Sequence, residues 1–442
     1  MNRLLRAYPF GFGRLGASVL VLIVAATAAC AGSSTPSGPK FGLTVGALLP
    51  FTGADGFFGP PEDAACLPAA RVINANGGVM GHMLTCGNFD TRGDPADAVP
   101  AARQMIASNP NLMVVIGCTG DEASAVVPLL DANHTPMFCL TGQSEFNKSS
   151  FTYFHRLIPP DAYEAYAMVG IALFVNHYTR IALVFGNDIG SQTFVGPAQK
   201  AIQNLGGTVV VNQALALGQS SYRTEVEKLI QANPQVILTE AMGPTGATYL
   251  SELKQLNHGL IPLIGTSSLI DPAIFQSLAA AVGVGDLVKY VTADSLETTF
   301  SGVAFDEFKT NLLASSAQLA KPDQYLGIPD VLHEYDGIVM TGLAMVAAKS
   351  TDPKVYNSWI VKVGNGYGSS PTVVNTYKEG LDALSQGKTI KFVGAGGPTL
   401  FDQWNNSQGG YVIVRYDTTG AAQEIGKLTR DQVTQLVQAG GG

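Results

Sequence analysis

Short apolar runs alternate with helical stretches along most of the 442-residue chain, and this alternation limits the fold more than any other feature. The pattern runs once through the first 140 residues and restarts after residue 180. Strands of four or five apolar residues joined by crossover helices form parallel sheets that helices cover on both faces. Two such series predict two α/β lobes of similar build. The strand-like runs are 43–49, 112–116, 137–140, 181–185, 208–211, 236–239 and 262–265.

The last third of the chain does not repeat this pattern. Its elements are expected to join the two sheets already formed, which requires the chain to cross between the lobes more than once. We expect strands at 287–291 and 411–416, and helices near 304–319, 331–349, 353–363 and 376–386.

The first thirty residues are typical of an export signal. Arg3, Arg6 and Arg14 form a basic start, and the uncharged run 15–29 is shorter than the ~20 residues of a membrane-spanning helix. Thr27-Ala28-Ala29-Cys30 resembles a bacterial lipobox, in which Cys30 is diacylated and becomes the mature N-terminus. An ordinary signal peptide with an incidental Cys30, or an uncleaved signal anchor, are the alternatives. Residues 31–42, rich in Ser, Gly and Pro at their start, are expected to form a flexible tether.

Four cysteines remain after Cys30, and an even number in an exported chain indicates disulfides. We favour the pairs Cys66–Cys86 and Cys118–Cys139, because each pair links elements expected to be neighbours in one lobe. Four cysteines allow three connectivities, so the other two stay open. The spacings, without a Cys-x-x-Cys pair, do not indicate a zinc site.

Charge and motifs exclude several functions. A formal net charge of −8 with scattered basic residues argues against a nucleic-acid partner. The chain has no Gly-x-Ser-x-Gly nucleophile elbow and no Gly-x-x-x-x-Gly-Lys-Ser/Thr phosphate loop, so we do not expect an enzyme. The six histidines are dispersed, and His333 has no spaced partner for a metal. We therefore expect neither a metal nor a cofactor.

Several stretches follow one another in a recognisable order. They are 45–53 (VGALLPFTG), Phe58-Gly59, 73–81 (INANGGVMG), 90–95 (DTRGDP), Val115-Ile116-Gly117, Tyr335-Asp336, and Phe392-Val393-Gly394 with Phe401-Asp402. Over roughly residues 43–425 the chain resembles type I periplasmic binding proteins, and most closely the leucine/isoleucine/valine-binding branch that serves ABC importers.

The resemblance implies two Rossmann-like lobes with parallel sheets flanked by helices, joined by three hinge crossovers and closing on a ligand. The expected parts are lobe I at 43–155 and 293–393, lobe II at 156–292 and 394–430, and a C-terminal tail at 431–442.

The ligand site can be placed from the sheets alone. In open parallel sheets, ligands bind beyond the carboxyl ends of the strands, where helix N-termini offer free N–H donors. In the first lobe these loops are 52–59, 118–122 and 141–145, and in the second 186–191, 240–245 and 266–268. The candidate ligand-binding residues are Phe57, Phe58, Thr119, Gly120, Asp121, Gly142, Gln143, Ser144, Ile189, Glu240, Met242 and Ser267.

Several candidates carry a structural alternative. Phe58 stands at the place of the family's ligand-contacting tyrosine, but one ring of the Phe57-Phe58 pair can pack on its own lobe. By resemblance, Asp121 replaces a serine that helps to hold a ligand carboxylate, although an acid near a helix start also caps that helix. If Asp121 faces the cleft, a cationic or neutral solute is favoured. The family's acid near Ser267 is missing, and Glu240 is either its substitute or a solvated rim carboxylate.

These features predict a monomeric solute-binding protein, exported and lipid-anchored on the outer face of the cytoplasmic membrane. Its solute is expected to be amino-acid-like, an amide or a small aromatic acid, which it would present to an ABC permease. The alternatives are a sensor of the same fold that signals to a membrane receptor and, more remotely, a lipid-anchored hydrolase.

Overall fold

The computed structural model describes residues 41–53, 56, 58–241, 243–298 and 300–442, which belong to one compact unit. The predicted signal segment, Cys30 and most of the predicted tether lie outside these residues. No helix within the described ranges is both long and apolar enough to span a bilayer.

The first sheet has five parallel strands in the order β2-β1-β3-β4-β5. Side chains alternate between its faces, as the period of a strand requires. Val45, Ala47 and Leu49 enter one core, and Leu48 enters the core on the opposite face. The strands are β1 (Leu43–Leu49), β2 (Leu84–Asp90), β3 (Leu112–Gly117), β4 (Met137–Cys139) and β5 (Phe154–His155).

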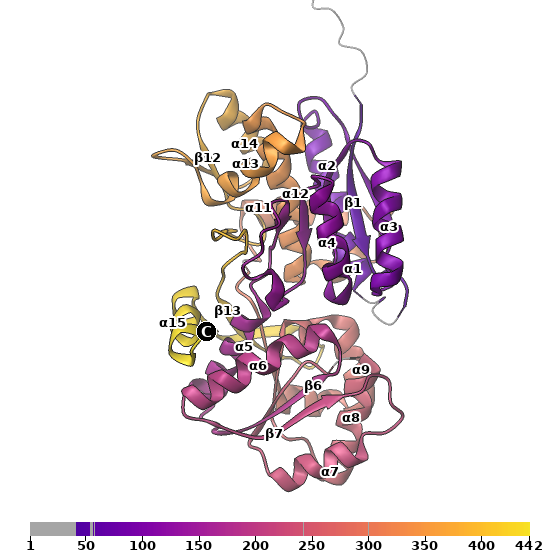
Figure 1. The fold of residues 1–442 in the computed structure, drawn as a ribbon, viewed down its shortest axis with the longest axis vertical. Coiled ribbons are helices and arrows are strands. Elements are labelled where there is room, and N and C mark those ends of the chain that lie inside the picture. The colour runs from indigo at the N-terminus through magenta and orange to yellow at the C-terminus, as the bar shows by residue number, and fades with distance from the viewer. Residues whose placement is uncertain (1–40, 54–55, 57, 242, 299) are drawn as a thin grey trace, which may run out of the picture. The chain divides into compact units, whose positions relative to one another are not determined.

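Helices cover both faces of this sheet. α3 (Pro95–Ser108) and α4 (Ala123–Ala132) lie on the Leu48 face, and α2 (Cys66–Ala75), preceded by α1 (Gly59–Asp63), lies on the other. Elements from much later in the chain join α2, shown in orange beside the indigo strands in Figure 1. They are α11 (Val303–Leu313), α12 (Pro329–Ala348), α13 (Pro353–Asn365), α14 (Tyr377–Ser385) and the parallel pair β11 (Thr372–Val374) and β12 (Ile390–Phe392).

The second sheet has seven strands in the order β14-β13-β10-β9-β8-β6-β7. The five strands from β6 to β10 run parallel, whereas β13 is antiparallel to both of its neighbours. The strands are β6 (Arg180–Gly186), β7 (Thr208–Leu215), β8 (Val236–Thr239), β9 (Leu263–Gly265), β10 (Val291–Leu296), β13 (Tyr411–Tyr416) and β14 (Ala422–Leu428).

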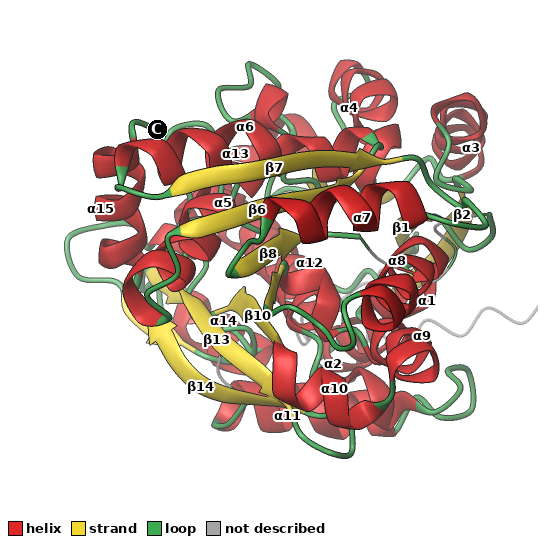
Figure 2. Cartoon of the chain, turned by 90° about the horizontal axis from the view of Figure 1, so that it is seen from below, coloured by secondary structure: helices red, strands yellow, loops and turns green. Residues whose placement is uncertain are grey.

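This sheet also lies between two layers of helices (Figure 2). Along β6, Ile181, Leu183 and Phe185 enter one core, and Ala182 and Val184 enter the other. The first core holds α5 (Asp161–Gly170), α6 (Ile189–Asn204) and α15 (Arg430–Gly440), and the second holds α7 (Arg223–Ala232), α8 (Gly243–Leu256), α9 (Pro272–Val282) and α10 (Val284–Tyr290).

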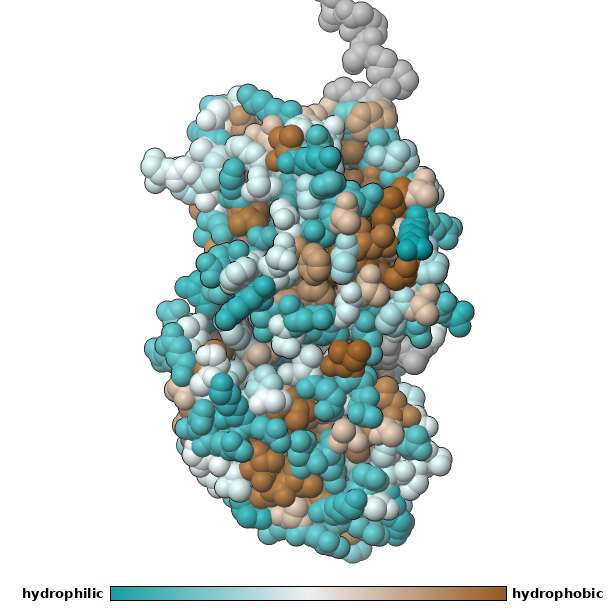
Figure 3. Space-filling model, viewed as in Figure 1, coloured by the Kyte–Doolittle hydropathy of each residue, from teal (hydrophilic) through white to brown (hydrophobic). Residues whose placement is uncertain are grey.

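The edge strand β7 exposes apolar side chains at the surface of the second sheet. Its residues Val209, Val210 and Val211 are only half-buried, because no strand pairs with the outer edge of β7. Figure 3 shows brown surface at the position of this strand.

The chain passes between the two sheets three times, as expected. It leaves the first sheet after β5, returns after β10 and leaves again after β12. Ala395 and Phe401 still belong to the core of the first sheet, so the last crossing falls later than the predicted boundary at residue 394.

Two local expectations were wrong. The strand predicted at 287–291 is the end of α10, and β10 begins only at Val291. Gly283, with φ of +89°, ends α9 and starts a further helical turn that buries Leu287. The expected C-terminal tail is the helix α15, which starts with a capping box formed by Thr429 and Gln432. Its Gly440 carbonyl accepts a hydrogen bond from Asn204 Nδ2 at 2.8 Å.

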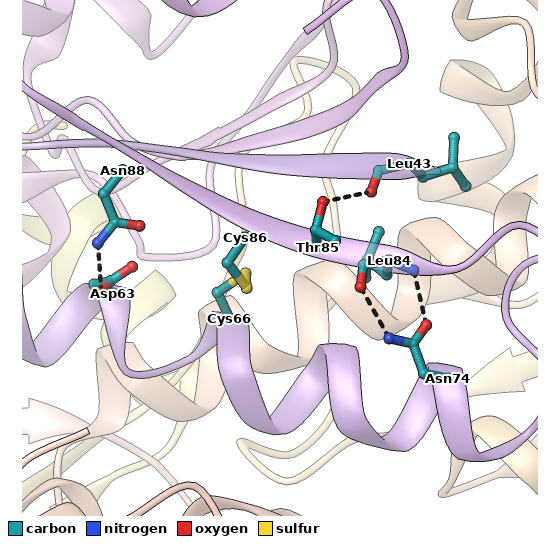
Figure 4. The surroundings of a disulfide bond; sticks show 8 residues. All are labelled: Leu43, Asp63, Cys66, Asn74, Leu84, Thr85, Cys86 and Asn88. Carbon is teal, nitrogen blue, oxygen red and sulfur yellow. Dashed lines mark hydrogen bonds between the residues drawn. A yellow bond between two sulfur atoms is a disulfide. The ribbon is translucent and has the colours of Figure 1, made fainter. Parts of the chain in front are cut away.

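Both favoured disulfides are present. Cys66–Cys86 joins α2 to β2 with a Cα–Cα distance of 6.1 Å, and Cys118–Cys139 joins the ends of β3 and β4 at 5.0 Å. Figure 4 shows that hydrogen bonds strengthen the first link, because Asn74 pairs with both backbone groups of Leu84. The second disulfide ties together two strands whose following loops line the cavity described next.

Candidate functional site

A cavity of about 580 Å³ lies where the strand-end loops of the two sheets meet. The first sheet supplies loops that follow β1, β3 and β4, and the second sheet supplies loops that follow β6, β8 and β9. These are the six loops that the carboxyl-end rule selects. Its volume falls in the usual range of small-molecule sites, ~300–1,000 Å³.

Most of the candidate residues line this cavity, although two do not. Ser144 is exposed at the start of a short 3₁₀ helix, and Ile189 is 56% exposed in the first turn of α6. Phe57 and Met242 lie outside the described residues. The candidates that line the cavity are Phe58, Thr119, Gly120, Asp121, Gly142, Gln143, Glu240 and Ser267.

Sequence reasoning missed most of the acidic lining. Seven carboxyl groups line the cavity, and only Asp121 and Glu240 among them were candidates. Four of the other five lie in the first turn of a helix, and Asp188 is the N-cap of α6; an acid in either place is ordinarily interpreted as favouring the helix start. Among the described lining residues there is no Lys, Arg or His. The five missed acids are Glu62, Asp161, Glu164, Asp188 and Asp330.

Asp161 and Gly142 are in close contact. The Asp161 N–H donates to the Gly142 carbonyl at 2.9 Å, and Thr193 Oγ1 donates to Asp161 Oδ2. A Cβ on Gly142 would fall 1.4 Å from Asp161 Oδ1, so only glycine fits at this position. Burial raises the pKa of Asp161 to about 7, although the Thr193 hydrogen bond opposes the rise. The Gly142 loop therefore already contacts a carboxyl group.

The guanidinium of Arg156 lies behind this loop. Its Nη2 donates to the Gln143 carbonyl at 2.8 Å, and its Nη1 donates to Asn147 Oδ1 at 2.9 Å. Burial lowers the pKa of Arg156 to about 10, and the nearby Asp161 opposes that change. Arg156 thus supports the loop and does not line the cavity.

Glu164 and Glu240 line the cavity from the second sheet. Glu164 Oε1 accepts a hydrogen bond from the Ser267 N–H at 2.6 Å. Glu240 Oε1 accepts from the hydroxyls of Thr266 and Ser268, each at 3.3 Å. The other oxygen, Glu240 Oε2, is buried and has no hydrogen-bond partner among the described residues. Burial and then the charge of Asp161 raise the pKa of Glu240 well above its usual value.

Glu62 and Asp330 face the cavity from α1 and from the first turn of α12. Glu62 is only 5% exposed, and within the described chain its Oε2 has no hydrogen-bond partner. Burial raises its pKa well above the usual range, and the neighbouring Glu334 and Asp330 add to the effect. Burial also raises the pKa of Asp330 to about 7.

Asp121 connects the two sides of the cavity. Its carboxylate does not cap its own short helix, η1 (Gly120–Glu122). Instead, Oδ1 accepts a hydrogen bond at 3.2 Å from the N–H of Gly190 in the first turn of α6. Burial raises the pKa of Asp121, and the charge of Asp188 adds to this, whereas the hydrogen bonds from α6 oppose it.

Apolar side chains complete the walls. They come from both sheets, so a ligand with a hydrocarbon part would contact both. They include Phe58, Leu140, Ile158, Phe194, Leu217 and Leu296.

Sequence comparison identifies similar proteins. The chain is 26% identical over 218 residues to a Leu/Ile/Val-binding protein of Rhizobium johnstonii, and this match covers 48% of the chain and 58% of the relative. A Leu/Ile/Val-binding protein homolog of Brucella melitensis is 24% identical over 196 residues, or 44% and 53% of the two chains. The chain thus spans little more than half the length of the curated relatives it matches.

Solved structures share the fold. The leucine-binding protein LivK of Thermotoga maritima matches with a TM-score of 0.70 at 17% identity, covering 88% of this chain and 99% of that one. A solute-binding protein of R. palustris, solved with 4-hydroxybenzoate, matches with a TM-score of 0.68 at 16% identity over 88% and 97% of the two chains. At these identities the likeness concerns the fold alone.

A family model settles the wider relationship. The model of the periplasmic binding proteins matches residues 42–304, which is more than half of the chain. The family and its structural neighbours are extracytoplasmic solute-binding proteins and not enzymes. The chain belongs to the periplasmic binding protein family, and its fold is that of the type I members.

Proposed function

We propose that this protein captures a small polar solute outside the cytoplasm and presents it to an ABC permease. The observation that carries the proposal is the 580 Å³ cavity, which strand-end loops of both sheets enclose. A solute bound there contacts both lobes at once. Its binding therefore favours the closed arrangement over an open one, which is the thermodynamic basis of hinge closure.

The lining supplies both affinity and selectivity. Apolar walls such as Phe58 and Phe194 bury hydrocarbon surface, and the carboxyl groups and loop backbone supply hydrogen bonds. A polar group of the solute that finds no partner after closure costs about 1–3 kcal/mol, so mismatched solutes are rejected.

The lipid anchor is part of the proposal. A diacylated Cys30 would hold the protein at the outer face of the cytoplasmic membrane, followed by the tether 31–42. A tether of this kind would keep the binding unit close to the permease while leaving it free to turn.

A ligand screen tests the proposal directly. The purified protein is incubated with amino acids, amides, amines and small aromatic acids, and its melting temperature is recorded against concentration. We expect one class to raise the melting temperature and to be recovered unchanged by mass spectrometry. Phe58→Ala should weaken that shift, and Ser144→Ala, outside the cavity, is the matched control. Turnover of the bound compound, or no stabilisation by any class, would refute solute capture.

A further inference from the structure

The cavity has a one-sided charge distribution. Seven carboxyl groups line it, three from the first lobe and four from the second, and no basic side chain does so in the described part of the chain. Arg156 lies behind the loop, where its two Nη atoms donate to Gln143 and Asn147, and its buried Nε has no partner among the described residues. A bound anion would therefore meet carboxyl groups on both sides without a compensating charge.

Two of these carboxyl groups have an unused oxygen. Glu62 Oε2 on the first lobe and Glu240 Oε2 on the second are buried, and neither has a hydrogen-bond partner among the described residues. A buried oxygen without a donor is costly, so such atoms indicate a ligand that donates hydrogen bonds. Glu62 belongs to the first lobe and Glu240 to the second, so a ligand that reaches both oxygens would be held by both lobes.

A metal ion does not explain the arrangement. Within the described ranges, no three His, Cys, Asp or Glu side chains are grouped so as to hold a metal ion. The apolar walls, including Phe58 and Leu217, also suit a hydrocarbon and not a hydrated ion.

We propose that the cavity binds an organic cation, namely an amine or amidine that carries no carboxylate. This inference rests on the proposed function and narrows its substrate class. The cationic head donates to the free oxygens of Glu62 and Glu240, and the hydrocarbon part lies against the phenyl rings. A carboxylate on the ligand would lie among the seven carboxyl groups of the lining, which include Asp161 against the Gly142 loop.

The protonation of the lining supports this assignment. Burial raises the pKa of Glu62, Glu240, Asp161 and Asp330, so part of the lining carries protons while the cavity holds no cation. A bound cation stabilises the ionised forms, so binding releases protons and tightens as the pH rises. Other ionisable groups near these carboxyls are Asp121, Glu122, Glu164, Asp188, Asp271, Asp294, Glu334, Tyr411 and Arg156.

Matched pairs of ligands test the class without any substitution. In two pairs, 3-methylbutylamine with leucine and 1,5-diaminopentane with lysine, the second compound only adds a carboxylate. In the third pair, 4-hydroxybenzylamine with 4-hydroxybenzoate, the carboxylate replaces the aminomethyl group. Binding is measured by calorimetry and by the shift in melting temperature, with magnesium chloride as the control for ionic screening. We expect at least one amine to bind and its carboxylate-bearing partner to bind at least tenfold more weakly, because the carboxylate would meet the carboxyl groups of the lining.

Isosteric variants test whether the cation binds at these two carboxyl groups. Glu62→Gln and Glu240→Gln should each weaken amine binding about ten- to hundredfold. Glu424→Gln, on the exposed strand β14, is the matched control and should leave the affinity unchanged. The melting temperature without ligand shows whether each variant is folded. If only one of the two variants folds, its affinity alone tests the assignment.

The outcomes separate the two proposals. Binding of leucine, lysine or 4-hydroxybenzoate at least as tightly as the matching amine would overturn the cationic class and leave solute capture standing. If no amine binds while another solute stabilises the protein, the cationic class is likewise overturned and solute capture still stands. Full affinity in both glutamine variants would also overturn the assignment.

Discussion

The carboxylate of Asp121, at the end of a first-sheet strand, accepts a hydrogen bond from the backbone N–H of Gly190, in the first turn of a second-sheet helix. The bond measures 3.2 Å and joins the two lobes at the edge of the cavity. A carboxylate at a helix N-terminus is also favoured by the helix dipole. In the proposed hinge motion, this contact would be lost when the lobes separate.

Removal of this contact should weaken ligand binding. Asp121→Ala is expected to lower affinity about tenfold, because a hydrogen bond to a charged group contributes about 1.5–3 kcal/mol. Asp121→Asn keeps the acceptor oxygen and should recover part of the loss. Calorimetry measures the affinity, and small-angle scattering of the unliganded protein should show a larger radius of gyration for the alanine variant. Wild-type affinity in Asp121→Ala would contradict a role in closure.

A methyl group at Gly142 should displace Asp161. Gly142→Ala is expected to lower both the melting temperature and the affinity, because its Cβ would lie 1.4 Å from Asp161 Oδ1. Gly196→Ala, in α6 with open space around the added Cβ, is the control and should be neutral or stabilising. Asp161→Ala removes the clashing carboxyl, so the double variant should recover stability. An unchanged Gly142→Ala protein would show that this loop is not as close as described.

The two disulfides should differ in their effect on binding. Replacement of either pair by serine is expected to lower the unfolding free energy by about 2–4 kcal/mol, since both close loops of similar length. Loss of Cys118–Cys139 should also weaken ligand binding, because it holds the strand ends that precede Thr119 and Thr141. Loss of Cys66–Cys86 should leave affinity near wild type. Denaturant unfolding and calorimetry measure the two quantities, and equal affinity losses would contradict this distinction.

The unliganded protein should lose stability between pH 6.5 and 8. Burial raises the pKa of Asp161 and Asp330 to about 7 and that of Asp336 to about 8, so in this range the folded chain binds more protons than the unfolded chain. Each such group lowers the unfolding free energy by up to about 1.4 kcal/mol per pH unit. His155 and His333, with pKa lowered to about 4, oppose the trend only at lower pH. Scanning calorimetry should show a falling melting temperature, and a rise would contradict the buried protonated carboxyls.

The lipid anchor is tested in cells. Cys30→Ser should release the protein from the membrane fraction, because the thiol that carries the lipid is lost. Fractionation followed by immunoblotting measures the distribution, with the wild-type protein as the reference. Retention of Cys30→Ser at the membrane would favour an uncleaved signal anchor.

The central strands could be predicted because their apolar runs are continuous. The residues of β6 and β8 are buried on both faces, so their sequences contain few polar interruptions. The edge strand β2 was not predicted, since Thr85, Gly87 and Asn88 interrupt any apolar pattern. The helix α10 was mistaken for a strand because it is only seven residues long and contains two valines, which favour strands.

The site could be predicted only as far as strand ends define it. Thr119, Gly142 and Glu240 follow their strands directly, so the topology of a parallel sheet brings them together. Asp161 and Asp330 start helices instead, and their position at the cavity depends on how those helices pack. Glu62 lies on a single helical turn after Phe58, where nothing in the local sequence indicates burial.

The order of the elements along the chain has a consequence for biosynthesis. The core of the first sheet includes α12 and Phe401, which come late in the chain, and the second sheet includes the late strands β13 and β14. The hydroxyl of Tyr356 reaches the carbonyl of Met113, 243 residues earlier, and Asn204 binds the carbonyl of Gly440. Neither half can complete its packing until almost the whole polypeptide has left the ribosome, and contacts this distant in sequence form slowly. The nascent chain is therefore expected to stay unfolded long enough to be threaded through a translocation channel.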